Sequence, residues 1–259
     1  MVKVSKSSPP NLIEKLIQST FLFKGLLRED LEQYIRVEDL KIEKLFSNRP
    51  VYTAFLPNET LDVLYMIVDE GLVIVRSTPL DRIIAISYPG GCFGMRSLPF
   101  SYGLASRAFP CLVESYKTTH VIKIPLPVVE KVYAENEIFR ERYRQIFELR
   151  EKFEYHLLNC SSYPPQAVAA LLRGLIYQER ALGNQPDKDG IPSLDLPVDV
   201  IARACQLNQR TVEQVLKGMQ QVGLIRNEGA GDIISILDAE TLKGVYSATR
   251  DKVNWWPLK

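Results

Sequence analysis

Residues 197–236 read PVDVIARACQLNQRTVEQVLKGMQQVGLIRNEGAGDIISI, and this stretch decides the fold. A short helical pattern over Val198–Ala204 leads through a tight turn into a second helix. Asn208 stands where its side-chain oxygen can cap the free N–H groups of that helix. The apolar residues of the second helix recur at i, i+3, i+4 and i+7, which predicts one buried face. They are Val212, Val215, Leu216 and Met219.

Behind the second helix, Gly223 occupies a position where a helix end favours a left-handed residue. Ile225 and the segment Ile233–Ile236 flank a glycine-containing tip, which predicts a β-hairpin. Helix, turn, helix and hairpin in this order are typical of a winged helix-turn-helix, whose second helix enters the major groove of DNA. The polar residues left on its outer face are Gln209, Arg210, Glu213, Gln214 and Lys217. The alternative is one more amphipathic helix in a core.

Composition is that of an ordinary folded protein. The chain has 259 residues, enough for two domains with a core each, and its net charge of +1 gives no overall basic signal for nucleic acid. No apolar run is long enough to cross a membrane, and the N-terminal MVKVSKSSPP does not have the pattern of a signal peptide. We therefore expect a cytoplasmic protein with no membrane partner.

The residue types that bind metals or catalyse reactions are scattered. The cysteines stand far apart, so buried thiols are expected rather than zinc or iron–sulfur ligands. They are Cys92, Cys111, Cys160 and Cys205. His120 and His156 have no evident catalytic company, and there is no phosphate-binding glycine loop. We expect no metal, no cofactor and no enzymatic activity.

The N-terminal half changes its apolar period along the chain. Residues 1–10 look like a flexible arm, and the spacing over 12–35 predicts two or three short helices. From Lys41 the period is two, with turn residues between the segments, which predicts a sandwich, jelly roll or barrel. The strands are expected at 42–46, 51–55, 63–68, 72–75, 83–86, 107–116 and 120–124.

A long helix is predicted over 128–160, with a break near Asn136. Its apolar residues are spaced four and three apart, with Arg150 between them. Such an a/d seam favours a helix that pairs with its copy in a dimer, and a charged residue fits a partly open seam better than a closed core. The predicted dimer interface is Phe139, Tyr143, Ile146, Arg150, Phe153 and Leu157. The alternative packs the same stripe on the chain's own barrel.

Prolines mark the boundary with the C-terminal half. We expect a hinge at 161–165, a helix at 167–177, an exposed loop at 183–190 and a strand at 193–196. Asp238 can cap a last helix that ends near residue 248, and the adjacent Trp255 and Trp256 are expected to pack on something. The resulting divisions are an arm (1–10), a roll of strands (11–127), a dimerisation helix (128–160), a winged helix-turn-helix (161–248) and a tail (249–259).

This order of elements resembles the family of the cAMP receptor protein and the fumarate–nitrate reduction (CRP/FNR) regulator. The motifs that carry the resemblance are Leu64–Ile67, Gly71–Val75, Gly91–Gly94, Arg107-Ala108, Ile201-Ala202, Gln209–Val212 and Gly223–Ile225. The resemblance implies an α+β fold with a cyclic-nucleotide-binding-like β-roll (jelly roll), a long dimerisation helix and a C-terminal winged helix-turn-helix. It also implies a homodimeric transcription regulator, in which a small effector in the roll re-aims two recognition helices on double-stranded DNA.

The effector turn departs from the cyclic-nucleotide binders of this family. Those have a Glu for the ribose hydroxyl where this chain has Met95, and a thioether is a poor partner for a hydroxyl. The turn is more similar to that of the cyanobacterial global nitrogen regulator, which senses 2-oxoglutarate. The resemblance thus implies a small anionic effector, not cAMP, held by backbone N–H groups with Arg96 or Arg107. The candidate effector residues are Phe93, Gly94, Met95, Arg96, Ser97, Arg107 and Ala108. Alternatively, Arg107 forms a structural ion pair and no effector binds.

The DNA-reading positions depart too. The family commonly has Arg-Glu-Thr-Val where this chain has Gln209–Val212, and Gln206 stands at the turn glycine. We expect Arg210 to take a guanine and Gln209 or Gln214 an adenine, with each bidentate pair contributing roughly 1–3 kcal/mol of discrimination. Phosphates are expected at Asn208, Thr211 and Lys217.

Charge in the C-terminal part limits the expected affinity. Residues 161–259 hold 11 Lys and Arg against 11 Asp and Glu, and Pro197 and Val198 replace the family's phosphate donors at the start of the first helix. Few neutralised phosphates mean weak non-specific binding and a shallow salt dependence. The alternative function is therefore a regulatory protein that binds RNA polymerase or another protein through the winged domain and the Trp255-Trp256 tail.

Overall fold

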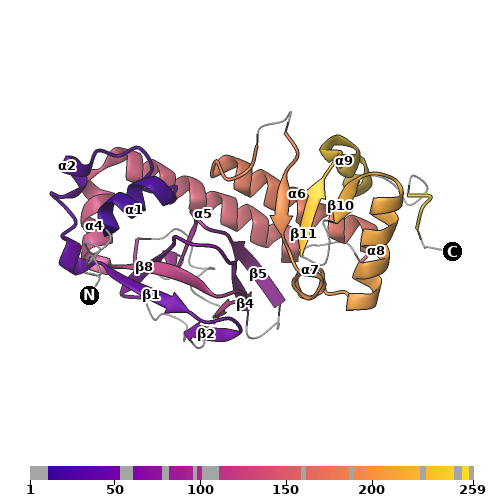
Figure 1. The fold of residues 1–259 in the computed structure, drawn as a ribbon, viewed down its shortest axis with the longest axis horizontal. Helices are drawn as coiled ribbons and strands as arrows, with labels where there is room; N and C mark the ends of the chain where they lie inside the picture. The colour runs from indigo at the N-terminus through magenta and orange to yellow at the C-terminus, as the bar shows by residue number, and fades with distance from the viewer. Residues whose placement is uncertain are drawn as a thin grey trace, which may run out of the picture.

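The structure is a computed structural model, and it describes residues 11–52, 61–77, 82–95, 98–100, 111–158, 162–186, 190–227, 232–247 and 253–256. Figure 1 shows an elongated arrangement, with the N-terminal helices and sheets at one end and the winged half at the other. Helix α5 (Glu137–Leu158) runs between the two ends. None of the helices within the described ranges is both long enough and apolar enough to cross a membrane.

Short helices open the chain and two antiparallel sheets follow, as predicted. The helices are α1 (Leu12–Ser19), α2 (Arg28–Leu31) and the 3-10 turn η1 (Val37–Asp39). The strands are β1 (Lys41–Leu45), β2 (Arg49–Tyr52), β3 (Val63–Ile67), β4 (Val73–Ser77), β5 (Arg82–Ser87), β6 (Cys92–Phe93), β7 (Cys111–Ser115) and β8 (Thr119–Pro125). Their orders are β1-β8-β3-β6 and β2-β7-β4-β5. The predicted positions 53–55 and 107–110 lie outside the described residues.

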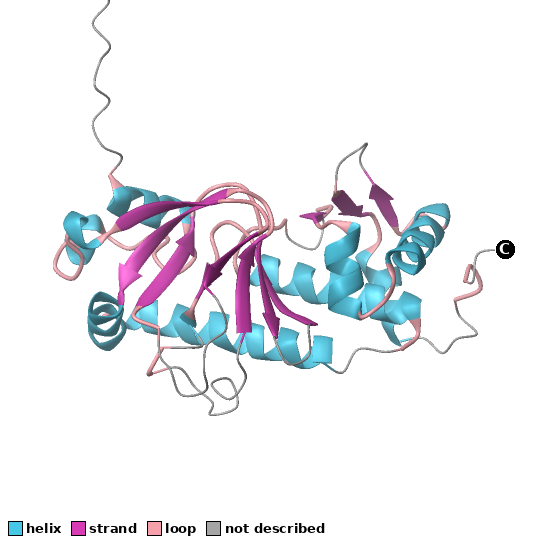
Figure 2. Ribbon diagram, turned by 90° about the horizontal axis from the view of Figure 1, so that it is seen from below, coloured by secondary structure: helices cyan, strands magenta, loops and turns pink. Residues whose placement is uncertain are grey.

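The two sheets form a roll because both contribute alternate apolar residues to one core. Tyr65 and Ile67 of β3 meet Val73 and Val75 of β4 there, together with Val113 of β7. The predicted jelly roll is confirmed. Figure 2 shows the strands lying over the long helix.

The predicted long helix is two helices. α4 (Leu126–Glu135) ends at Asn136, and α5 begins directly after it. Asn136 leaves the helical region, and its Oδ1 accepts a hydrogen bond of 2.9 Å from the backbone N–H of Phe139. The break near Asn136 is confirmed, and its cause is an N-cap that serves the second helix.

The apolar stripe of α5 is buried inside the chain, which corrects the predicted dimer seam. Its six residues are each at most 6% exposed in the single chain: Phe139, Tyr143, Ile146, Arg150, Phe153 and Leu157. The first three pack with the N-terminal helices and the roll, and the rings of Phe139 and Phe23 lie 5.1 Å apart. Phe153 and Leu157 pack with α6 (Pro164–Ala181) and with strands β4 and β5. The stripe therefore faces the chain's own barrel, which was the alternative.

The winged half follows the predicted order. It contains α6, β9 (Ser193–Asp195), α7 (Val198–Cys205), α8 (Gln209–Gln221), β10 (Ile225–Asn227), β11 (Ile233–Ile236) and α9 (Ala239–Ser247). The strands form an antiparallel sheet in the order β10-β11-β9. The prolines expected in the hinge, Pro164 and Pro165, instead occupy the first turn of α6, where a missing N–H costs no hydrogen bond.

The two halves share a core, although we expected one core each. Leu72, Ile74, Ile83 and Ile86 of the roll pack in the same cluster as the apolar residues of α6, α7 and α8. Trp255 and Trp256 are half-buried against this cluster, as predicted for the tail. Because the core is continuous, the position of the winged half is fixed on the roll.

Candidate nucleic-acid interface and effector turn

A tight turn sets the angle between α7 and α8. Gln206 adopts the left-handed conformation, with φ 54° and ψ 42°, and its N–H donates to the carbonyl of Ala202. The N–H of Leu207 donates to the same carbonyl at 2.9 Å. A non-glycine residue in this conformation costs on the order of 1 kcal/mol, which the closed turn must offset. The predicted turn is confirmed with Gln206 in the glycine position.

Helix α8 begins at the predicted cap. Asn208 Oδ1 accepts a hydrogen bond of 2.8 Å from the N–H of Thr211. This use of the oxygen leaves the side-chain amide N–H₂ of Asn208 as the group that could contact a phosphate. At the other end Gly223 has a φ of 74°, which is the left-handed residue expected there.

The six predicted DNA-binding residues lie together at the start and on the outer face of α8. Thr211 is half-buried and the other five are exposed, namely Asn208, Gln209, Arg210, Gln214 and Lys217. The opposite face is buried against the core through Val212, Val215 and Met219. Figure 1 shows α8 at the end of the molecule that lies away from the roll. The polar face is thus open to a large partner.

The wing adds a basic residue that the sequence analysis did not single out. Arg226 is exposed on β10, between buried Ile225 and exposed Asn227. Successive strand residues point to opposite faces, so its position next to the apolar Ile225 was the signal that could have identified it. The tip of the wing, residues 228–231, lies outside the described residues.

Polar contacts hold the winged half on the roll. Lys117 Nζ lies 2.6 Å from Asp195 Oδ1 and 3.1 Å from Asp232 Oδ2, at the base of the wing. The Tyr116 hydroxyl donates to Asp199 Oδ1 on α7 at 2.5 Å. Burial, together with this hydrogen bond, raises the pKa of Tyr116 well above that of a free tyrosine. These contacts place α7, and through it α8, relative to the sheet.

A second link uses Glu114 of β7. Its two carboxylate oxygens accept from Arg76 of β4 at 3.1 Å and from Arg203 of α7 at 3.2 Å. One acidic residue of the roll thereby joins its own sheet to the first helix of the helix-turn-helix.

The candidate effector turn follows β6, and its side chains point into the core. Phe93 stacks on Tyr65 with ring centroids 4.6 Å apart, and both Phe93 and Met95 are fully buried. Gly94 has a φ of 90°, and a Cβ there would lie 3.2 Å from the carbonyl oxygen of Val63. Only the backbone of these three residues could therefore meet an effector. Arg96, Ser97, Arg107 and Ala108 lie outside the described residues.

Two residues of the α5 stripe hold this turn in place. The Tyr143 hydroxyl donates to the carbonyl of Met95 at 2.8 Å. The buried Arg150 guanidinium donates to the carbonyl of Cys92, and to Ser87 Oγ at 2.8 Å. The spacing along the helix predicted both residues in a dimer seam. Their polar groups within an apolar stripe indicated that hydrogen-bond acceptors lie beside the stripe, but not which ones.

Among the described residues, three cysteines and His120 lie apart from one another. Cys92 and Cys205 are buried, Cys111 is half-buried, and burial raises the pKa of the Cys92 thiol. His120 Nδ1 lies 2.8 Å from Asp69 Oδ2, in a surface ion-pair group. Within the described part of the chain, no three His, Cys, Asp or Glu residues gather as metal ligands. Cys160 lies outside that part.

Comparisons with known proteins identify solved structures of similar fold. No family model matches the sequence, and no curated protein matches it. Among solved structures, FixK2 from Bradyrhizobium japonicum has a TM-score of 0.59 at 16% identity, over 81% of this chain and 98% of that one. A CooA variant from Carboxydothermus hydrogenoformans has a TM-score of 0.59 at 15% identity, over 87% and 94%. The c-di-GMP responsive global regulator CLP from Xanthomonas campestris has a TM-score of 0.50 at 12% identity, over 78% and 95%. The chain therefore has the fold of these proteins.

Proposed function

We propose that this chain is a DNA-binding transcription regulator that reads sequence with α8. The observation that carries the proposal is the outer face of α8, where six polar residues lie together at the end of a capped helix beside a wing. A helix presented in this way fits the major groove of DNA. The shared fold with CLP, a c-di-GMP responsive global regulator, supports it.

The long polar side chains of α8 are the groups that read the bases. Arg210 suits the O6 and N7 acceptors of guanine, and Gln209 or Gln214 suits adenine. Asn208, Thr211 and Lys217 stand where they can hold phosphates, and Arg226 of β10 is a further candidate.

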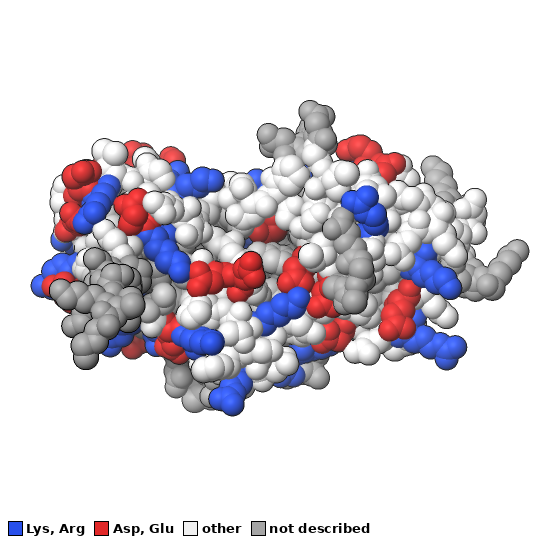
Figure 3. All heavy atoms as spheres, viewed as in Figure 1, with Lys and Arg blue, Asp and Glu red and all other residues white. Residues whose placement is uncertain are grey.

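Binding should be weak away from a specific site. Figure 3 shows basic and acidic side chains interspersed over one face, rather than a basic surface. With a net charge of zero over residues 161–259, few phosphates are neutralised and the salt dependence is shallow. Specificity should then depend on base contacts and on pairing of two copies.

We further propose a homodimer that pairs through the outer face of α5. The exposed residues over the first three turns of α5 follow a spacing of three and four: Ile138, Glu141, Gln145 and Glu148. Ile138 is 49% exposed at the start of this face, and it is a large apolar surface to leave in water. Sedimentation velocity over a range of protein concentrations tests the pairing.

An anionic effector is proposed at the backbone of the 93–95 turn, with Arg96 or Arg107 as the cation. The bonds from Tyr143 and Arg150 support this, because a ligand that moves the turn must also move the contacts with α5. cAMP is not favoured, since Met95 offers neither a surface nor a hydrogen-bonding group for a ribose hydroxyl.

The test is Arg210→Ala. A duplex enriched from a random library by the wild-type protein should bind the variant with a loss of roughly 1–3 kcal/mol, measured by fluorescence anisotropy. Lys243→Ala, which removes an exposed cation from α9, is the matched control and should bind normally. No enrichment of any duplex, even at low salt, would contradict the proposal.

The neutral winged half favours one second candidate, which is a regulator that binds a protein partner. The tail contributes little to that candidate, because both tryptophans pack on their own domain. A partner captured equally well after nuclease treatment, together with no enriched duplex, would favour it.

A further inference from the structure

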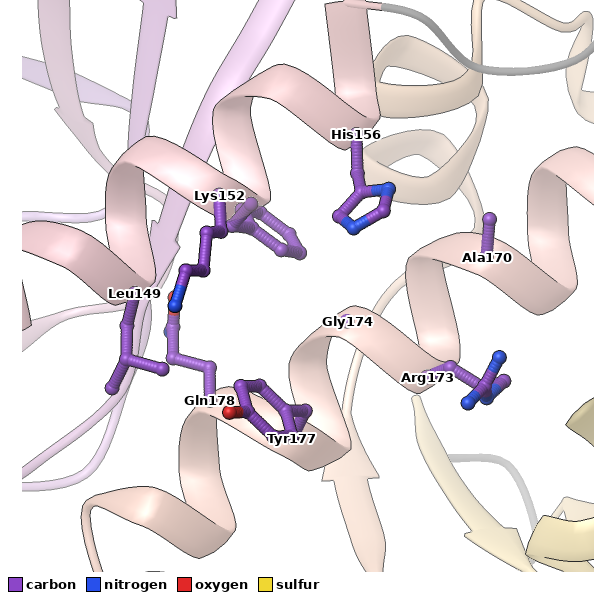
Figure 4. Close-up of a pocket in the computed structure, with 9 residues that line it drawn as sticks. Leu149, Lys152, His156, Ala170, Arg173, Gly174, Tyr177 and Gln178 are labelled. Carbon is purple, nitrogen blue, oxygen red and sulfur yellow. The ribbon is translucent and has the colours of Figure 1, made fainter.

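A groove opens between the C-terminal half of α5 and the middle of α6. It encloses about 290 Å³, close to the lower end of the roughly 300–1,000 Å³ range of small-molecule sites. Figure 4 shows its lining side chains coming from these two helices alone. None of the candidate DNA-reading or effector-turn residues lines it.

The floor of the groove is apolar. Leu149 and Phe153 of α5 and Ala170 of α6 contribute to it, and all three are buried or half-buried. Gly174 keeps α6 close to α5, because a Cβ there would lie 3.0 Å from two ring atoms of Phe153. The glycine thus lets the Phe153 ring lie directly against the backbone of α6, and the ring forms part of the floor.

The rim of the groove is basic. Lys152 and His156 are exposed on α5, and Arg173 is half-exposed on α6. Tyr177, 63% exposed, adds an aromatic ring and a hydroxyl. None of the described lining residues is a carboxylate. A lysine at the rim of an apolar floor attracts an anion that also carries an apolar body, because the charge stays beside the solvated ammonium of Lys152 while the body leaves water.

We propose that this groove binds a small organic acid with a planar apolar body. The ligand's ring lies on the floor at Phe153, and its acid group meets Lys152, which Figure 4 shows on the α5 side of the groove. The ligand contacts the last helix of the sensor half and the first helix of the winged half at once. The site is independent of DNA binding and of the 93–95 turn.

The experiment is isothermal titration of the full chain, without DNA, using 1-naphthoate as the probe and 1-naphthamide as its uncharged counterpart. Naphthoate should bind with saturation, and the amide about tenfold or more weakly, because it lacks the charge-assisted contact. Lys152→Gln should weaken naphthoate by a similar factor. Lys243→Gln, an exposed cation on α9, is the matched control and should not change it. Ala170→Leu, which fills the floor, should abolish binding.

Three outcomes overturn the proposal. Equal affinity for naphthoate and naphthamide shows an apolar site with no acid specificity. Unchanged naphthoate affinity in Lys152→Gln shows that the probe binds elsewhere. This variant changes an exposed residue, so it should fold. If naphthoate does not bind with saturation, and sedimentation velocity shows a dimer that Ala170→Leu dissociates, then a second copy fills the groove. Failure of the Arg210→Ala test leaves all of these readouts unaffected, since none contains DNA.

Discussion

Helices α5 and α8 both carry an apolar stripe and a polar face, but the sequence predicted the surroundings of only one of them. The stripe of α8 is buried within the winged half, and its polar face is exposed, as expected. The stripe of α5 was expected to meet a second copy, and it is buried against the roll and α6 instead. Amphipathic spacing shows that a face is buried, and the identity of what covers it depends on contacts distant in sequence.

Arg150 shows why the α5 prediction was wrong. A charge within an apolar stripe was interpreted as a sign of a partly open seam. In the structure the guanidinium is 6% exposed and is satisfied by Ser87 Oγ and the carbonyl of Cys92. A backbone carbonyl is not encoded by any particular residue, so sequence reasoning had no means of identifying this acceptor.

The largest expected effect comes from a substitution in the apolar stripe of α5. It distinguishes burial inside the chain from a dimer seam. Phe139→Ala should lower the free energy of unfolding by about 3–5 kcal/mol, because it leaves a cavity beside Phe23 in the chain's own core. Urea unfolding, followed by circular dichroism, should give the same loss at low and high protein concentration.

The control for that measurement is Glu130→Ala, exposed on α4, which should change stability by less than about 0.5 kcal/mol. A loss in Phe139→Ala that shrinks as the protein concentration rises would restore the dimer seam at this position.

A smaller effect tests whether an asparagine N-cap fixes the first residue of both helices. Asn136 and Asn208 cap α5 and α8 through bonds of 2.9 and 2.8 Å. Asn136→Ala and Asn208→Ala should each cost about 1 kcal/mol of unfolding free energy, measured in urea. The Asn→Asp variants keep an acceptor oxygen and should retain most of the stability. A loss at one helix only would show that tertiary packing, rather than the cap, fixes the other helix start.

Local features of this kind, in which a residue acts on its near neighbours in the chain, are what the sequence could predict. Asn208, Gln206 and Gly223 act within a few residues of themselves, and the break at Asn136 was predicted for the same reason. The two-residue strand β6 was missed because its pairing with β3 is not visible in so short a run. The core that the two halves share depends on segments far apart in the chain, and the groove depends on how the consecutive helices α5 and α6 pack on each other. Neither produces a periodic pattern of apolar residues in the sequence.

The last prediction concerns Glu179, which lies on α6 close enough to Arg150 of α5 for the arginine charge to affect its titration. Burial raises the pKa of the Glu179 carboxyl, while hydrogen bonds from Asn184 at 2.8 Å and Gln178 at 2.9 Å, and the charge of Arg150, oppose the rise. A carboxyl with a raised folded-state pKa binds its proton more tightly in the folded chain. Its contribution to stability is therefore fully present below the unfolded pKa of about 4.5 and is lost as pH rises through the folded pKa.

Glu179→Gln carries no such charge, so the free energy of unfolding of this variant, relative to the wild type, should improve as pH rises above about 4.5. Urea unfolding at a series of pH values measures the difference, with Glu213→Gln on the exposed face of α8 as the matched control. A difference that runs the other way would mean that the donors and Arg150 outweigh burial. The carboxylate would then stabilise the packing of α5 against α6, as an ion rather than as a neutral acid.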